Sequence, residues 1–310
     1  MSMVKLLSKI DQPKISELGG KGYSLSILIN NGFNVPKGLV ISSDTFFAYL
    51  KQNNLMERIE KLAFEIDENN FREKSEEIKN LILSGKIPEE IKSEIGENLK
   101  KLNVQYVSIR SSAVSEDSLK SSFAGLHDSF LNIEAETNSV LENVKKCWAS
   151  LFNKRAVVYR IKKKILYLEG MAVIVQEMVP AEVSGITFTV RPMNKKSLLV
   201  EASYGVGDII VDGRVEPDDY TVDRETLEIT EKKIGSKNKI RAIEGKEIKI
   251  IDMEKSLAGE QALKDNKVKE IAEICLKVEK IFNYPQDIEW CISNAKLWLL
   301  QSRAITGVII

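Results

Sequence analysis

The stretch DIEWCISNAKLWLLQSR, residues 287–303, alternates polar and apolar side chains on either side of a short polar turn. This pattern predicts an antiparallel β-hairpin. A three-residue loop over 294–296 would place Glu289 opposite Gln301, whereas a two-residue loop would place Glu289 opposite Leu300. We predict the three-residue loop, because it gathers the polar residues of the hairpin instead of scattering them.

In this register the hairpin has one polar face. Asp287 lies opposite Arg303, and both share a face with Glu289 and Gln301, because strand side chains repeat with a period of two. Mg²⁺ takes hard oxygen ligands from one or two side chains, with phosphates and water completing its shell. The pattern therefore fits a magnesium site, and the alternative is a solvent-facing hairpin held by salt bridges.

Outward from the hairpin, apolar periodicity predicts strands and helices in mixed order, which is typical of the α+β class. The nearly continuous apolar run 171–179 predicts a central strand, with 184–190 as its neighbour. We expect two lobes, 1–180 and 181–310, with mixed or antiparallel sheets flanked by helices. Other expected strands are 39–42, 106–112, 128–133, 198–205 and a hairpin over 218–230; expected helices follow Gly22, cover most of 44–101 with a break near 85–88, and span 137–166 and 254–282.

Composition excludes several classes of function. The chain has 310 residues, with 45 Lys and Arg balanced by 45 Asp and Glu, so it lacks the net positive field of a dedicated nucleic-acid or membrane-surface binder. Its three cysteines, an odd number far apart in the sequence, fit reduced thiols in a cytoplasmic protein. We predict no secretory signal, and no apolar run approaches the ~20 residues of a membrane span.

Three segments suit phosphate binding. Gly19–Gly22 predicts a glycine loop ahead of a helix, with Lys21 as a point charge; the alternative is a tight turn with an exposed lysine. Arg110 ends a predicted strand and could hold phosphate oxygens bidentately, or pair with the nearby acidic residues 116–117. The Ser/Gly loop 121–125 could close over phosphates, or could be a plain hairpin loop.

Two further features are weaker. The strand end 176–179 could offer backbone N–H and C=O groups to a purine, or could be only a buried strand. His127 is the single histidine of the chain, and a structural role is the simpler interpretation. Any mechanism that needs another histidine must therefore take it from elsewhere.

Together, in this order, the segments resemble the N-terminal ATP-binding domain shared by phosphoenolpyruvate synthase, pyruvate phosphate dikinase and rifampin phosphotransferase. The resemblance extends from about residue 15 to residue 305. The matching stretches are LGGKGYSLSIL, VPKGLVIS, VSIRSSAVSEDSLKSSFAGLHDSFLNI, CWASLFNKRAVVYR, VIVQEMVPAEVSGITFTVRP, EASYGVGDIIVDGRVEPDDY, and DIEW with LLQSR.

The resemblance implies an ATP-grasp-like fold that holds ATP and Mg²⁺ between two lobes, and it implies a role for each matching residue. The implied set is Lys21 and Arg110 on the phosphates, Ser122, Ala124 and Gly125 in a covering loop, Gln176, Glu177, Met178 and Val179 around adenine, Glu289 and Gln301 on Mg²⁺, and Arg303 neutralising the transferring phosphates. Lys21, Arg110 and Arg303 would be the catalytic residues.

The resemblance also implies an AMP-forming phosphotransferase that passes a phosphoryl group from ATP to a histidine. That histidine belongs to a stretch like TxGGxxSHxA, which this sequence lacks, so a separate domain or chain is expected to carry it. The alternatives are a non-catalytic nucleotide-binding module and a truncated domain of a longer enzyme. The sequence departs from the family pattern at Leu126 and at Arg191 before Pro192, and the positive charge that Arg191 adds could change nucleotide preference or affinity.

Overall fold

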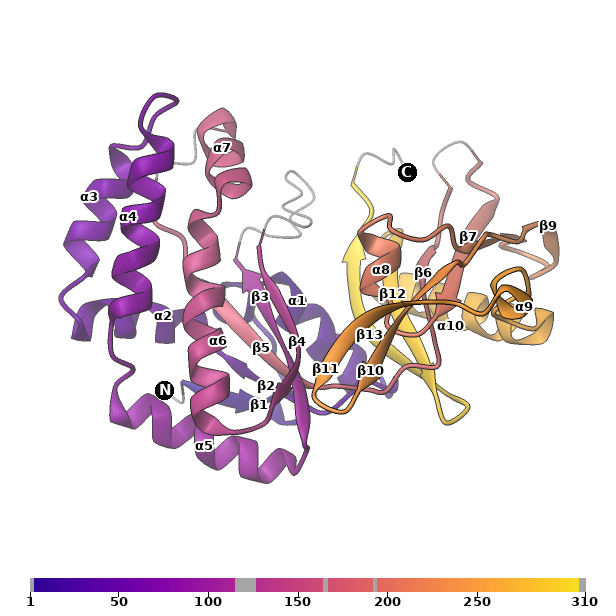
Figure 1. Cartoon of the computed structure of the whole chain (residues 1–310), viewed down its shortest axis with the longest axis horizontal. Helices are drawn as coiled ribbons and strands as arrows, with labels where there is room; N and C mark the ends of the chain where they lie inside the picture. The colour runs from indigo at the N-terminus through magenta and orange to yellow at the C-terminus, as the bar shows by residue number, and fades with distance from the viewer. Residues whose placement is uncertain (1–2, 115–126, 164–166, 192–193, 307–310) are drawn as a thin grey trace. The chain divides into compact units, whose positions relative to one another are not determined.

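A computed structural model describes residues 3–114, 127–163, 167–191 and 194–306 (Figure 1). The described chain combines helices with antiparallel sheets, which confirms the predicted α+β class. Its contacts divide it into two compact units. Unit 1 holds the described residues of 1–30 and 37–178, and unit 2 holds those of 31–36 and 179–310.

Unit 1 is built on a five-stranded antiparallel sheet in the order β1-β2-β5-β3-β4. The strands are β1 (Val4–Leu6), β2 (Gly38–Ile41), β3 (Tyr106–Ala113), β4 (Ser129–Glu134) and β5 (Met171–Glu177). The apolar strand β5 is central, as predicted, with β2 and β3 as its neighbours. The prediction that 184–190 lies beside it is wrong, because that segment belongs to the sheet of unit 2.

Helices cover both faces of this sheet. The helices of unit 1 are η1 (Leu7–Lys9), α1 (Ile15–Asn30), α2 (Ser43–Gln52), α3 (Met56–Phe64), α4 (Phe71–Ser84), α5 (Glu89–Leu102), α6 (Thr137–Ala149), η2 (Ser150–Phe152) and α7 (Lys154–Lys163). Val173 and Val175 point into the main core, where Trp148 packs on Phe46 and Tyr49 with ring centroids 5.6 and 4.9 Å away. The opposite face, including Ile174, meets α1.

Several predicted helices are shorter than expected. The break near 85–88 is confirmed between α4 and α5, and 44–101 is further divided between α2 and α3 and between α3 and α4. The single helix predicted over 137–166 is instead α6, η2 and α7. Among the described helices, none has the length and apolar character that crossing a bilayer requires.

Unit 2 contains a six-stranded antiparallel sheet in the order β13-β12-β6-β7-β8-β9 and a separate hairpin, β10-β11. The strands are β6 (Val183–Phe188), β7 (Ser197–Tyr204), β8 (Asp218–Asp223), β9 (Ile229–Lys233), β10 (Lys239–Glu244), β11 (Glu247–Asp252), β12 (Gln286–Ser293) and β13 (Lys296–Ala304). The helices are α8 (Asp208–Val211), α9 (Lys255–Ala258) and α10 (Asp265–Phe282), so the helix predicted over 254–282 is interrupted. The hairpin predicted over 218–230 is confirmed as β8 and β9.

The two faces of the six-stranded sheet differ in chemistry. One face carries Ile288, Trp290 and Val200, all fully buried, and lies under α10. The other face meets α8 through Ile186, which packs with Ile209 and Ile210. Next to Ile186, this second face also carries the side chains of Glu289 and Glu201, which pair directly with it.

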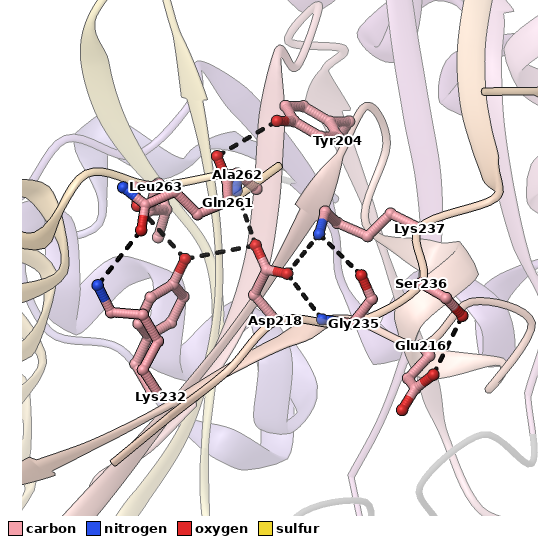
Figure 2. Close-up of polar contacts among 11 residues, drawn as sticks. Tyr204, Glu216, Asp218, Lys232, Gly235, Ser236, Lys237, Gln261, Ala262 and Leu263 are labelled. Atoms are coloured by element: carbon pink, nitrogen blue, oxygen red, sulfur yellow. Dashed lines mark hydrogen bonds and ion pairs between the residues drawn. The ribbon is translucent and has the colours of Figure 1, made fainter. Parts of the chain in front are cut away.

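A fully buried ionic cluster joins β8 to the segments around it (Figure 2). The Asp218 carboxylate accepts hydrogen bonds from Lys237 Nζ, from the N–H of Gly235 at 3.0 Å and from the N–H of Ala262 at 2.7 Å. The Tyr220 hydroxyl donates to it at 3.3 Å. One side chain thus ties residues 235–237 and 262 to the start of β8.

Candidate functional site

The Gly19–Gly22 segment lies inside α1 but begins with a break at Gly19, so the helix predicted after Gly22 starts earlier, directly after Gly19. The whole of α1 begins at Ile15, and within α1 only Gly19 departs from helical geometry, with φ 66° and ψ 177°. A positive φ suits glycine, and here it kinks the helix. Lys21 lies just beyond the kink and is 8% exposed, which excludes the alternative of an exposed turn lysine.

The hydroxyl of Ser112, on β3, bonds to the two backbone groups of α1 on either side of the kink. In a regular helix the N–H of Gly22 would donate to the carbonyl of Leu18. Here Gly22 N–H donates to Ser112 Oγ at 3.2 Å, and Ser112 Oγ donates to Leu18 O at 2.8 Å. The serine hydroxyl is therefore inserted into the helical hydrogen-bond ladder next to Lys21.

Arg110 and Gln176 lie on one face of the five-stranded sheet. In the β3–β5 register Arg110 is opposite Ile174, and Ser108 is opposite Gln176. Because paired residues and residues two apart on a strand share a face, all four point to the same side. That side meets α1, since a Cβ added at Gly22 would lie 3.0 Å from Ile174 Cδ1. The structure thus gathers Arg110, Gln176 and the helix that carries Lys21 on one face of unit 1.

The side-chain amide of Gln176 suits a ligand. Gln176 is 2% exposed, and its Nε2 has no hydrogen-bond partner within the parts of the chain that the structure describes. A buried donor without a partner costs free energy, so such groups are rare unless something else satisfies them. An adenine ring nitrogen is one acceptor that would do so.

The backbone of 176–179 is less available than predicted. The N–H of Glu177 donates to Lys37 O at 2.7 Å, and the N–H of Met178 donates to Tyr106 O at 2.9 Å. These two N–H groups therefore serve the fold of unit 1. Val179 is the first residue of this stretch that belongs to unit 2.

The predicted covering loop lies outside the described residues. Ser122, Ala124, Gly125 and Leu126 lie outside the described residues, as does Pro192. His127 is described, and its Nδ1 lies 3.2 Å from Ser150 O. Arg191 Nη1 donates to Thr221 Oγ1 at 2.8 Å. The positive charge by which Arg191 departs from the family pattern therefore lies over β8 of unit 2.

The β12–β13 hairpin has the predicted pairing from Asp287 to Glu289, but a different turn and a different register next to the turn. Glu289 lies opposite Gln301, as predicted. The loop is only Asn294–Ala295, however, and the register shifts at a β-bulge after Glu289 that accommodates Leu300 as an extra residue. The bulge, and not a longer loop, restores the pairing.

Arg303 and Asp287 are also opposite each other, as predicted, and form an ion pair. Arg303 donates from Nε at 2.8 Å and from Nη2 at 2.6 Å, both to Asp287 Oδ2. Asp287 is 6% exposed, and its burial raises the pKa of the carboxyl while the charge of Arg303 opposes that rise. This face is largely buried, so the alternative of a solvent-facing hairpin is wrong.

Further carboxylates, which the sequence reasoning missed, share the face of Glu289. Burial, followed by the negative charges of Asp219 and Asp287, raises the pKa of Glu201 to about 7. The one available signal was a lone carboxylate inside the apolar run 198–203. Directly paired residues form a row across the sheet from β13 to β9: Gln301, Glu289, Ile186, Glu201, Asp219 and Lys233.

The oxygen ligands at Glu289 and Gln301 suit Mg²⁺, which keeps phosphate and water ligands, better than they suit a metal ion held by protein side chains alone. No group of three or more His, Cys, Asp or Glu side chains in the described residues is arranged to hold a metal ion. Glu289 and Gln301 nevertheless present two side-chain oxygens from directly paired positions. Two protein oxygens with phosphate and water ligands are what Mg²⁺ commonly takes.

Comparison with known proteins supplies the context for this geometry. The chain is 35% identical to a probable phosphoenolpyruvate synthase of Methanocaldococcus jannaschii, in an alignment that covers 99% of this chain and 27% of that protein. It is 36% identical to a probable phosphoenolpyruvate synthase of Methanothermobacter thermautotrophicus, covering 98% and 46% of the two chains. For the rifampicin phosphotransferase of Bacillus subtilis the identity is 33%, covering 98% and 36%. The chain thus spans less than half the length of these relatives.

The family model described as pyruvate phosphate dikinase, AMP/ATP-binding domain, matches residues 15–308. The match confirms the resemblance drawn from the motifs and agrees with the predicted ATP-grasp-like class. Because it covers nearly the whole sequence, this chain belongs to the pyruvate phosphate dikinase AMP/ATP-binding domain family.

Proposed function

We propose that this chain is the ATP-binding part of an AMP-forming phosphotransferase that passes a phosphoryl group from ATP to a histidine on a separate domain or chain. The observation that carries the proposal is the family match over residues 15–308. The relatives named as phosphoenolpyruvate synthases and rifampicin phosphotransferase are all much longer than this chain, which leaves room for further domains.

In this proposal unit 1 supplies the groups for the nucleotide. Lys21 and Arg110 hold phosphate oxygens, because a buried lysine and an arginine on the α1 face of the sheet supply positive charge there. The Gln176 amide, whose Nε2 has no hydrogen-bond partner among the described residues, hydrogen-bonds the base. Ser122, Ala124 and Gly125 cover the phosphates, and Glu177, Met178 and Val179 line the adenine pocket.

Unit 2 supplies the groups for the metal and for charge neutralisation. Glu289 and Gln301 hold Mg²⁺, which when bound would offset the charge of the phosphates. Arg303, which Asp287 orients, neutralises charge on the transferring phosphates. The reaction then depends on positioning and on neutralising charge as the phosphoryl group moves.

The proposal is tested in two stages. First, calorimetric titration should show that the chain binds ATP in the presence of Mg²⁺. Second, labelled ATP and the histidine-bearing domain of a phosphoenolpyruvate synthase should yield AMP, inorganic phosphate and a phosphohistidine. Formation of ADP only would contradict the AMP-forming reaction. Tight binding without any transfer would favour a non-catalytic nucleotide-binding module.

The metal assignment has its own matched variants. Mg²⁺ should lower the dissociation constant for ATP. Glu289→Ala and Gln301→Ala should each reduce that effect of Mg²⁺ by about tenfold or more. Glu247→Ala, an exposed carboxylate on the separate β10–β11 hairpin, should leave it unchanged. Circular dichroism spectra that match the wild type would show that the fold is intact. If Glu289→Ala binds Mg-ATP like the wild type, Glu289 is not a metal ligand.

A further inference from the structure

We infer that Ser112 is a positioning residue whose hydroxyl holds the kinked start of α1 against β3 and so fixes Lys21 relative to Arg110. The inference rests on the proposed function, because it assigns Ser112 to the phosphate-binding side of the same ATP site. Ser112 is fully buried, and we expect it to act through its neighbours and not by touching the nucleotide.

The first step of the argument is the bonding at the kink. Gly19 breaks the helix, and this separates Leu18 O from Gly22 N–H, a pair that a regular helix would join. Ser112 Oγ bonds to both groups, at 2.8 and 3.2 Å. The two ends of the five-residue span from Leu18 to Gly22, which contains Lys21, are therefore both tied to one side chain on another element.

The second step is the tight fit of that contact. A Cβ added at Gly19 would lie 2.0 Å from Ser112 O and 2.4 Å from Ser112 Oγ. The backbone of Gly19 thus packs directly against the carbonyl and hydroxyl oxygens of Ser112, and only glycine, which has no Cβ, allows that approach. Removing the hydroxyl would leave two buried backbone groups of α1 without their partner.

The third step links this anchor to Arg110. Arg110 and Ser112 lie two residues apart on β3, opposite Ile174 and Ala172 of the central strand β5. Their side chains therefore point to the same side, about 7 Å apart along the strand. Strand β3 therefore carries both Arg110 and Ser112, and Ser112 anchors the part of α1 that contains Lys21. One rigid strand thus fixes the positions of both cationic residues.

Comparing the binding of Mg-ATP with the binding of adenosine shows whether Ser112 positions Lys21 or only stabilises unit 1. If Ser112 positions Lys21, losing the hydroxyl should weaken binding of the triphosphate and spare binding of the base. If Ser112 only stabilises unit 1, binding of ATP and adenosine should change together or not at all. The measured quantity is therefore the ratio of the dissociation constants for adenosine and Mg-ATP, from ligand-observed NMR and calorimetry respectively.

The variant is Ser112→Ala, and the matched control is Ser26→Ala. Ser26 is also fully buried, lies on α1, and donates its hydroxyl to Gly22 O at 2.8 Å, but it does not bridge the kink. We expect Ser112→Ala to weaken Mg-ATP binding about tenfold or more and adenosine binding less than about twofold. We expect Ser26→Ala to keep the wild-type ratio. Equal changes for both ligands in Ser112→Ala would overturn the inference.

Two further readouts keep the test decisive. In the wild type, the Gly22 amide should exchange slowly with solvent although it lies at a helix break; exchange as fast as an unprotected amide would refute the bridging bond even if Ser112→Ala fails to fold. Wild-type protein that does not bind Mg-ATP would instead refute the proposed function itself. Wild-type binding with an unchanged ratio in Ser112→Ala would refute only the role of Ser112.

Discussion

Lys237 and Asp218 form an ion pair in which neither side chain reaches solvent. Removing two charges from water is costly, and their attraction offsets that cost only when the remaining donors and acceptors are also satisfied. Here the Asp218 carboxylate accepts three further hydrogen bonds, as Figure 2 shows. The pair is therefore stable as a unit and sensitive to the loss of either member.

Lys237→Met should destabilise unit 2 strongly. The variant leaves the Asp218 carboxylate buried without its cation, and breaking such a pair typically costs about 3–5 kcal/mol. The free energy of unfolding, measured by urea denaturation followed by circular dichroism, should fall by that amount. Lys233→Met is the control, because Lys233 pairs with Glu216 at 2.8 Å with side chains 62% and 51% exposed. Its loss should be much smaller, because solvent screens an exposed pair, and equal losses would contradict the argument.

Ala295→Gly should stabilise the β12–β13 hairpin. The two turn residues Asn294 and Ala295 have φ of 50° and 61°, the left-handed conformation that two-residue hairpin turns of the primed types require. A side chain in that conformation costs about 1 kcal/mol, which glycine avoids. The free energy of unfolding should rise by about that amount. Ala242→Gly, in strand β10 and without a positive φ, should instead lower it, since glycine weakens a strand.

This turn also illustrates what sequence could predict. The alternation around Glu289 was enough to predict its pairing with Gln301. It was not enough to separate a three-residue loop from a two-residue loop with a bulge at Leu300, because both give the same pairing beyond the bulge. Local pattern predicted the pairs from Asp287 to Glu289, whereas the pairs from Trp290 to Ser293 follow the two-residue loop, and the backbone route between the two registers needed the structure.

Features that depend on strand order were out of reach. Segments 171–179 and 184–190 are adjacent in sequence and both apolar, yet β5 and β6 belong to different sheets. The carboxylate row through Glu289, Glu201 and Asp219 exists only because β6 lies between β12 and β7. No local periodicity reports such long-range pairing. The Ser112 bridge was hidden for the same reason, since it joins residues 90 apart in the chain.

Glu201→Gln should change how stability depends on pH. Burial and neighbouring carboxylates raise the pKa of Glu201 from 4.5 to about 7. Between these values the folded state keeps a proton that the unfolded state releases, so the free energy of unfolding falls as pH rises through this window. The variant cannot ionise and lacks that fall. Urea denaturation at several pH values should show the wild type losing stability relative to Glu201→Gln as pH rises from 4.5 to 7.

Glu216→Gln provides a control of opposite sign. Glu216 is exposed, and hydrogen bonds from Lys233 and Ser236 lower the pKa of its carboxyl. A lowered pKa contributes stability that is present above the ordinary value and lost as pH falls. Relative to this variant the wild type should therefore gain stability with rising pH. The same trend in both variants would show that the local environment of Glu201 is not what the structure indicates.

Arg303→Lys should impair phosphoryl transfer without unfolding the chain. The planar guanidinium holds Asp287 through Nε and Nη2, which fixes the orientation of the whole group. A lysine ammonium is a point charge and cannot reproduce this fork while also meeting a phosphate. We expect AMP formation, assayed with a histidine-bearing domain, to fall about tenfold or more. The control is Arg224→Lys, which alters a comparable partly buried pair with Glu279 in the same unit. It should keep transfer within about twofold, because Arg224 has no proposed role in ATP binding. If both variants lose transfer equally, the defect comes from weakened packing of unit 2, and Arg303 has no special place in the reaction.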